Sequence, residues 1–394
     1  MIAGAGVIGT CTAYFLAKHH GIKCTMVDPT GTIAPAASGK AGGFLARDWN
    51  DGSPTEALTH RSFDVHQELA DTLGAETIDY RRLTCAAISV DSRRRGRPSG
   101  KKLAGIEWAQ PPEEEAASGV VGVRSLGSTN TIAQVHPKKL CERLWQEASK
   151  PVVEGGVGSE LVSGKVVGAV HDEKSGKLIA AQLDNGTTIA TDAILFACGP
   201  WTANILFGVK YHSAIVATDR ILSQCVFFSG CGDPEVYVRP DQTAYCTGFP
   251  DDEVYVTEEP GQETVRPDRI AAIVRSVREA TSGTGDSAES SSSGSLQLDQ
   301  PLVTEQACYL PTTRNGLPVM GRLSSETVGG DGPCFIAAGH SCWGILLGPA
   351  SGEAMANLIA TGQSTNGVDL TYFDPKRSGT IRLRVVEANL KKNG

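Results

Sequence analysis

The stretch Gly4-Ala5-Gly6-Val7-Ile8-Gly9 constrains the fold of this chain more than any other part of the sequence. It follows a short apolar run and opens a segment with apolar residues at helical spacing, which predicts a strand, a tight turn and a helix. In such a turn the glycines allow the bend, the approach of a pyrophosphate and close helix–strand packing. Asp28 ends the next predicted strand, where a ribose-binding carboxylate belongs. The pattern predicts dinucleotide binding, with a turn that serves packing alone as the alternative, and leaves FAD and NAD open.

Length and composition exclude several other classes of protein. A chain of 394 residues is long for one compact unit, so we expect two domains or one domain with a large insertion. The net charge of −8 argues against a general nucleic-acid binder, and no apolar run is long enough for a membrane span. Eleven cysteines without a CxxC pair disfavour zinc ribbons and dithiol reductases, and no metal site is predicted.

The same cysteine usage bears on the compartment. Scattered cysteines without a disulfide framework favour a reduced, intracellular setting, and we expect the cytoplasm. An organelle is the alternative if residues precede Met1, because the first predicted strand comprises only three residues. The oligomeric state is left open by the sequence.

Glycine-rich segments recur late in the chain, whereas an NAD domain usually completes its cofactor site within its first half. They are ASGKAGGFLA (37–46), CGPW (198–201), ACYLPTTRNGLPVMG (307–321) and GHSCWGILLGP (339–349). Together with the first turn, this ordered set closely resembles the D-amino-acid oxidase and glycine oxidase superfamily of FAD enzymes, over nearly the whole chain. The sequence is most similar to the amadoriase-like fungal and plant branch of putative oxidoreductases.

The resemblance implies an α/β fold, in which a Rossmann-like FAD-binding domain carries an inserted α+β substrate domain. The FAD-binding domain would comprise residues 1–80, 131–210 and 300–394, and the substrate domain residues 81–130 and 211–299. Two further segments are interpreted as solvated loops rather than localisation or phosphorylation signals. They are the basic stretch 91–102 and the serine-rich stretch 281–295.

The resemblance also assigns the cofactor contacts. The ADP half would be held by Gly4, Gly6, Val7, Ile8, Gly9 and Asp28, and the pyrophosphate and flavin by Ser38, Lys40, Ala41 and Gly42. The adenine would be bracketed by Val167, and the second crossover formed by Cys198, Gly199 and Trp201. The flavin ring would be lined by Gly339, His340, Cys342, Trp343, Gly344, Ile345 and Leu346, ahead of a helix from about Pro349 to Gly362. The glycines would let a flat ring pass close to the backbone.

The reaction implied is oxidation of the C–N bond of a small amine or N-substituted amino acid. Hydride passes to flavin N5, water hydrolyses the imine, and O2 takes up the electrons to give H2O2. Sarcosine-type oxidases use a substrate-domain lysine for the oxygen step, but this chain has no lysine between Tyr211 and Pro375. We therefore predict Lys40 and His340 as the catalytic residues that supply positive charge. The alternatives are a solvated or phosphate-pairing lysine and a histidine that caps the turn.

The chain departs from its relatives where they bind a substrate carboxylate. Leu310 and Cys342 stand at positions where such enzymes carry arginine, so a larger or less acidic amine is expected instead of glycine or a simple D-amino acid. Other cations are available at Arg47, Arg239 and Arg314. Three tyrosines are candidates for the pocket floor, with core packing as the favoured alternative: Tyr245, Tyr255 and Tyr309.

Cys308 occupies the place where sarcosine oxidases and amadoriases attach flavin covalently. We expect dissociable FAD and a buried thiol, with the covalent link as the alternative. The missing arginines and lysine also leave two other functions open. One is an FAD-binding protein with a trafficking or interaction role and little catalysis. The other is an FAD dehydrogenase that passes electrons to an acceptor other than O2.

Overall fold

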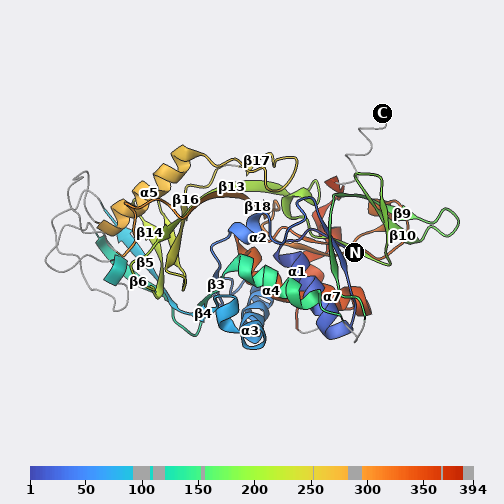
Figure 1. The fold of residues 1–394 in the computed structure, drawn as a ribbon, viewed down its shortest axis with the longest axis horizontal. Coiled ribbons are helices and arrows are strands. Elements are labelled where there is room, and N and C mark those ends of the chain that lie inside the picture. The colour runs from blue at the N-terminus through green and yellow to red at the C-terminus, as the bar shows by residue number, and fades with distance from the viewer. Residues whose placement is uncertain are drawn as a thin grey trace.

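The computed structural model describes residues 1–91, 107–109, 120–151, 156–251, 253–282, 295–364 and 367–384. Figure 1 shows an elongated molecule with a helix-rich part around α1 and α7 at one end and a large sheet with α5 at the other. These helices are α1 (Val7–His20), α7 (Gly344–Thr361) and α5 (Pro267–Ser282). No helix in the described part of the chain has the length and apolar character needed to cross a membrane.

The helix-rich part is built on a mostly parallel sheet. In the described chain its strand order is β19-β20-β12-β1-β2-β8, and only β19 runs antiparallel to its neighbour. In chain order the strands are β1 (Ile2–Ala3), β2 (Thr25–Asp28), β8 (Glu160–Ser163), β12 (Ile194–Phe196), β19 (Val319–Arg322) and β20 (Cys334–Ala338). This sheet and its helices confirm the predicted Rossmann-like α/β fold.

Four helices form the core beside this sheet. They are α1, α7, α3 (Glu56–Leu73) and α4 (Pro137–Ala148). Every residue of α1 from Val7 to Leu16 is buried, because α4 and α7 both pack against it. Glycines in α7 allow the closest contact: a Cβ at Gly352 would lie 2.4 Å from Cβ of Cys11 and 2.8 Å from the backbone nitrogen of Thr12.

The second part is a larger sheet covered by α5. As far as the chain is described, its strand order is β17-β13-β16-β15-β14-β5-β6, and β18 pairs with residues 207–215 of β13 along its other edge. In chain order these strands are β5 (Thr84–Val90), β6 (Val120–Gly127), β13 (Phe207–Ala217), β14 (Gln224–Ser229), β15 (Glu235–Val238), β16 (Thr243–Gly248), β17 (Glu253–Val254) and β18 (Thr304–Thr312). The predicted boundary at residue 210 falls inside β13, and β18 lies in this sheet although it follows residue 300.

Shorter elements complete the fold. One small sheet is β3 (Phe44–Ala46), β7 (Ile132–Gln134) and β4 (Arg81–Arg82), and another is β9 (Val166–His171), β10 (Leu178–Leu183) and β11 (Thr188–Ala190). The short α-helices are α2 (Ala37–Lys40) and α6 (Ser325–Val328). The 3-10 turns include η4 (Gly199–Trp201) and η5 (Ser341–Trp343). Of the two predicted loop segments, residues 92–102 and 283–294 lie outside the described residues, whereas Thr281 and Ser282 are the last residues of α5 and not part of a loop as predicted.

Candidate active site

The first glycine turn has the geometry that its sequence predicts. Gly4 has φ of +106°, and a Cβ there would lie 2.5 Å from the carbonyl oxygen of Ala197 on the neighbouring strand segment. A Cβ at Gly9 would lie 2.1 Å from the carbonyl oxygen of Gly4, so the third glycine lets α1 pack on the turn. The N-terminus of α1 therefore comes close to β1 and β12.

Asp28 is buried at the end of β2 and its carboxylate is held on both sides. The backbone N–H of Ala5 donates to Oδ2 at 3.1 Å, and the N–H and hydroxyl of Thr30 donate to Oδ1 at 3.0 and 2.8 Å. These bonds fix the carboxylate beside the glycine turn, in the position predicted for ribose binding.

The second glycine-rich segment folds against the first. The backbone N–H of Val7 donates to Oγ of Ser38 at 2.9 Å, which joins α2 to the N-terminus of α1. Lys40 points elsewhere: its Nζ donates to Oε2 of Glu263 at 2.9 Å and to the carbonyl oxygen of Ala307 at 3.0 Å. The Glu263 carboxylate is fully buried, so the ion pair joins α2 to the segment before α5, and the bond to Ala307 joins it to β18 of the larger sheet.

The late glycine-rich turn leads into α7, which begins at Gly344 and not near Pro349 as predicted. Pro349 lies inside the helix and has no N–H for the carbonyl of Ile345. His66 on α3 replaces that donor, with its Nε2 2.9 Å from the Ile345 oxygen, and Ser62 accepts the N–H of Ala350 at 3.0 Å. Contacts from α3 therefore allow the helix to start one turn earlier than the proline suggests.

The two glycines of the turn before α7 have different surroundings. Gly339 has φ of +84°, and a Cβ there would lie 2.9 Å from Cγ2 of Thr313, so packing within the chain requires this glycine. At Gly344 a Cβ would meet only Cβ of His340, at 3.7 Å, and the residue faces the cavity described below. Both glycines line the cavity, and their contact with a flavin stays a prediction.

His340 is fully enclosed and neutral at physiological pH. Burial lowers its pKa to about 3, and its Nε2 lies 3.1 Å from Oγ of Ser351. The ring lines the cavity, but it supplies no positive charge there at neutral pH. The catalytic roles of Lys40 and His340 stay predictions.

One continuous cavity of about 620 Å³ is lined by residues from all five glycine-rich segments. From the predicted cofactor residues it is lined by Gly4, Gly6, Val7, Ile8, Asp28, Ser38, Ala41, Gly42, Cys198, Gly199, Trp201, Gly339, His340, Cys342, Trp343, Gly344 and Ile345. Gly9, Lys40, Val167 and Leu346 do not line it; on the Val167 strand segment the lining residues are Gly164, Lys165 and Val166. We call this space the central cavity.

The residues of the central cavity fit a flavin dinucleotide. At one end lie the buried Asp28 carboxylate and the N-terminus of α1, which favours phosphate. At the other end lies the N-terminal turn of α7, whose helix dipole favours negative charge. At Gly344 the space beside the backbone is open, since a Cβ there would meet only His340 at 3.7 Å, as close approach of a ligand requires.

A group of aromatic side chains also lines the central cavity, and we call it the aromatic compartment. Of its residues, the sequence analysis named only Tyr245 as a candidate. We define it as Phe44, Trp49, Phe227, Tyr237 and Tyr245, all of which line the central cavity. Tyr237 stacks on Tyr245 with ring centroids 5.6 Å apart and on Phe44 at 5.4 Å. The Tyr237 hydroxyl donates to Glu235, which also lines the cavity. Alternating residues of β15 place Glu235 and Tyr237 on one face.

The predicted alternative cations do not line the central cavity, although Arg239 lies 5.7 Å from the centroid of the Tyr245 ring. Arg47 lies 3.6 Å from Asp64, Arg314 lines a second, separate cavity, and buried Arg239 donates to the carbonyl of Ala41 at 3.1 Å. Leu310 and Cys342, the positions where relatives carry arginine, do line the central cavity. Among the candidate tyrosines, Tyr245 lines it; Tyr309 is buried beside Trp201, and Tyr255 is fully exposed.

Cys308 is a buried thiol on β18 that lines the central cavity. Burial raises its pKa to about 12, so the thiol is protonated in the structure described here. A buried, protonated thiol is in keeping with the expected dissociable cofactor, while the covalent alternative stays untested.

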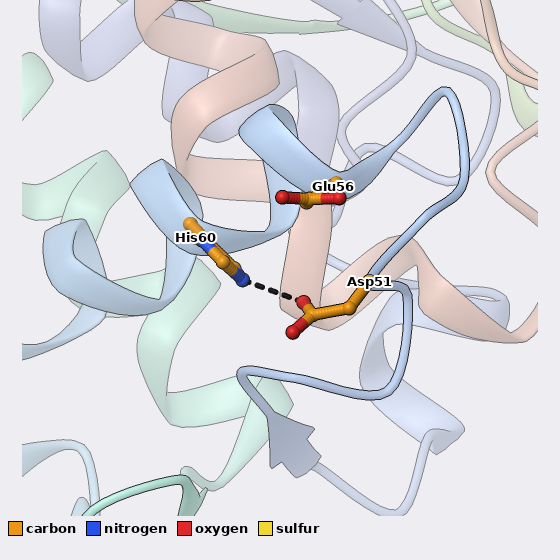
Figure 2. Close-up of side chains that lie close together, drawn as sticks. All are labelled: Asp51, Glu56 and His60. Atoms are coloured by element: carbon orange, nitrogen blue, oxygen red, sulfur yellow. Dashed lines mark hydrogen bonds and ion pairs between the residues drawn. The ribbon is translucent and has the colours of Figure 1, made fainter.

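A separate polar cluster lies at the start of α3, as Figure 2 shows. Nε2 of His60 is 2.7 Å from Oδ1 of Asp51, and Glu56 accepts the backbone N–H of Gly52 at 2.7 Å. Their ligand atoms lie within 4.8 Å of one another, close enough to share a metal ion. The contacts also hold the loop before α3, and none of the three residues lines the central cavity.

Comparison with known proteins decides the family. The model of the FAD dependent oxidoreductase family, DAO, matches residues 1–358. The chain belongs to the DAO family. It is 30% identical to a putative oxidoreductase of Schizosaccharomyces pombe, over 96% of this chain and 98% of the relative. A putative oxidoreductase of Saccharomyces cerevisiae is 27% identical, over 95% and 94% of the two chains.

Solved structures show the same DAO fold. Glycine oxidase from Geobacillus kaustophilus superposes with a TM-score of 0.68 at 20% identity, covering 95% of this chain and 96% of that one. Iminodiacetate oxidase from Chelativorans superposes with a TM-score of 0.70 at 16% identity, covering 95% and 98%. The cofactor of this DAO-family protein is FAD, as the sequence predicted.

Proposed function

We propose that this FAD-dependent oxidoreductase oxidises the C–N bond of a small amine or N-substituted amino acid, with O2 as electron acceptor and H2O2 as product. The observation that carries the proposal is the central cavity, which continues from the dinucleotide turn past α7 into the aromatic compartment. The similar structures named glycine oxidase, iminodiacetate oxidase and L-proline dehydrogenase act, by these names, on compounds with a C–N bond.

The residues of the chain bind, orient and exclude water. Bound FAD supplies the two-electron acceptor for the substrate C–N bond. The aromatic compartment presents apolar faces that strip water from a substrate, and Glu235 is a carboxylate able to bind its ammonium group. The N-terminal turn of α7 directs its partial positive charge into the cavity and stabilises negative charge that develops there.

The experiment is turnover of the purified protein, loaded with FAD, on a panel of primary and secondary amines. We expect anaerobic bleaching of the flavin spectrum by at least one amine, followed by H2O2 release on admission of air. No bleaching by any amine would contradict the proposal and favour an interaction role with little catalysis.

A dehydrogenase is the second candidate, and the surroundings of Lys40 and His340 favour it. The Lys40 ammonium is bound by Glu263 and the Ala307 carbonyl, and His340 is neutral, so neither offers a free cation to O2. Air reoxidation of the reduced protein separates the two candidates. Slow reoxidation that Lys40→Met leaves unchanged, together with rapid reoxidation by an artificial dye, would replace the oxidase with the dehydrogenase.

A further inference from the structure

The aromatic compartment combines aromatic rings, of which Tyr237 is stacked against Phe44 and Tyr245, with one carboxylate. Phe44, Trp49, Phe227, Tyr237 and Tyr245 come from four different strand segments and a loop, and converge on the central cavity. Ring faces carry partial negative charge and attract cations, above all organic ammonium groups. A carboxylate beside such faces adds a full negative charge, so both components of this wall favour the same kind of ligand.

Glu235 has no cationic partner among the residues that the structure describes. Its recorded hydrogen bond comes from the Tyr237 hydroxyl, and no ion pair within the described chain involves it. Burial raises the pKa of Glu235 above its usual range, because loss of hydration disfavours the charged carboxylate. An ammonium group in the cavity would favour the charged form.

Of the two cations that line the same cavity, Arg384 is bound to backbone carbonyls and Lys165 belongs to the segment that meets the end of β2. Arg384 donates to the carbonyl oxygens of Ala203 and Leu206, and Lys165 follows Gly164, whose N–H bonds to the carbonyl of Asp28. The positions suited to bind a substrate carboxylate hold Leu310 and Cys342. A carboxylate placed in the aromatic compartment would face Glu235, and Arg239, 5.7 Å from the centroid of the Tyr245 ring, does not line the cavity.

We propose that Glu235 and the aromatic compartment form a binding site for organic cations, so that the substrate is an amine that carries positive charge and no carboxylate. That the bound amine is also a substrate rests on the proposed function, whereas the cation site itself can be tested by binding alone.

The test uses the holoenzyme and choline, with binding followed through the visible flavin spectrum. Choline is compared with its carbon isostere dimethylbutanol, in which a quaternary carbon replaces the nitrogen, and with benzoate. We expect choline to bind at least about tenfold more tightly than dimethylbutanol, a difference of about 1.4 kcal/mol, and benzoate more weakly still. This comparison needs no variant and so does not depend on how a substitution folds.

Glu235→Gln then locates the site, because glutamine keeps the shape and still accepts the Tyr237 hydroxyl. We expect its Kd for choline to rise at least about tenfold while that for dimethylbutanol is unchanged. Glu305→Gln is the matched control, since it removes an exposed carboxylate from β18 of the same sheet. Equal binding of choline by Glu235→Gln and the unchanged protein, or tighter binding of benzoate than choline, would overturn the proposal.

The outcomes also separate this inference from the proposed function. If choline binds through Glu235 but no amine bleaches the flavin, the cation site stands and the oxidase proposal fails. If sarcosine, which carries a carboxylate, is turned over as well as the diamine putrescine, the oxidase proposal stands and this inference fails.

Discussion

Gly42 is the residue on which the shape of the aromatic compartment depends most directly. A Cβ there would lie 2.1 Å from Cδ2 of Tyr237 and 3.0 Å from Cδ1 of Tyr245. The sequence predicted Gly42 as a contact of the pyrophosphate and flavin. The structure gives it a second task, because the stacked tyrosines pack directly on its backbone.

We expect Gly42→Ala to displace Tyr237 and to destabilise the protein by about 1–3 kcal/mol, the usual result of overpacking. Denaturant unfolding measures the loss, and choline titration of the holoenzyme measures the damage to the compartment. Gly122→Ala is the control, because a Cβ at Gly122 meets only the Ser89 side chain at an ordinary 3.8 Å. A Gly42→Ala protein as stable as this control would refute the packing argument.

At the scale of elements, α7 depends on α3 for the backbone bond that Pro349 cannot make. His66 donates to the Ile345 carbonyl inside a buried interface, and Arg61 adds a bidentate pair with Glu353 of α7. The turn of α7 that faces the central cavity is therefore held from outside its own helix. A sequence pattern that treats each helix separately does not predict this dependence.

We expect His66→Ala to cost about 1–3 kcal/mol, because it leaves a buried carbonyl without a donor. In a Pro349→Ala background the restored N–H can reach that carbonyl, so the same His66→Ala change should cost less. A double-mutant cycle of unfolding free energies measures the difference. Equal costs in both backgrounds would show that His66 acts through packing alone.

Two glycines of α7 should respond differently to alanine. Gly352→Ala places a Cβ against Cys11 and the α1 backbone, so we expect loss of stability with or without FAD. Gly344→Ala meets only His340 at an ordinary distance but projects into the central cavity, so we expect normal stability of the FAD-free protein and weaker FAD binding. Calorimetry and FAD titration of both variants test this; reversed effects would exclude the assigned roles.

At the scale of the whole molecule, stability should fall on mild acidification. Burial lowers the pKa of His340 to about 3 and those of His66 and His136 to about 4, from an ordinary 6.5. Below pH 6.5 the unfolded chain therefore binds protons that the folded chain excludes. The stabilising effect of the neutral rings is complete at pH 7 and is lost as the pH falls toward 4.

We expect the unfolding free energy to decrease between pH 6 and 5. Each of the three buried histidines contributes at most about 1.4 kcal/mol per pH unit to this decrease. His340→Gln should lower that slope by about one such increment. Denaturant unfolding at several pH values measures the slopes. A flat dependence in the unchanged protein would contradict the burial of these rings.

The sequence by itself determined the parts of the site that are local. Gly4, Gly6 and Gly9 followed by Asp28 predicted the dinucleotide turn, because the requirements of the turn, the helix and the next strand are all met within one short segment. The resemblance extended this to the later glycine-rich segments, which line the same cavity. The role of these residues can be predicted without knowing which other residues surround them in the fold.

Only the tertiary structure decided which side chains surround the substrate end of the cavity. Lys40 meets Glu263, 223 residues away, and the aromatic compartment draws on β3, β14, β15 and β16, so no spacing in the chain reveals either group. The start of α7 was likewise predicted wrongly. The sequence predicts a helix from about Pro349, but His66 of α3 supplies the hydrogen bond that the proline cannot make, so the helix begins earlier. Ion pairs and hydrogen bonds form between residues that are close in space, and only the fold determines which residues these are.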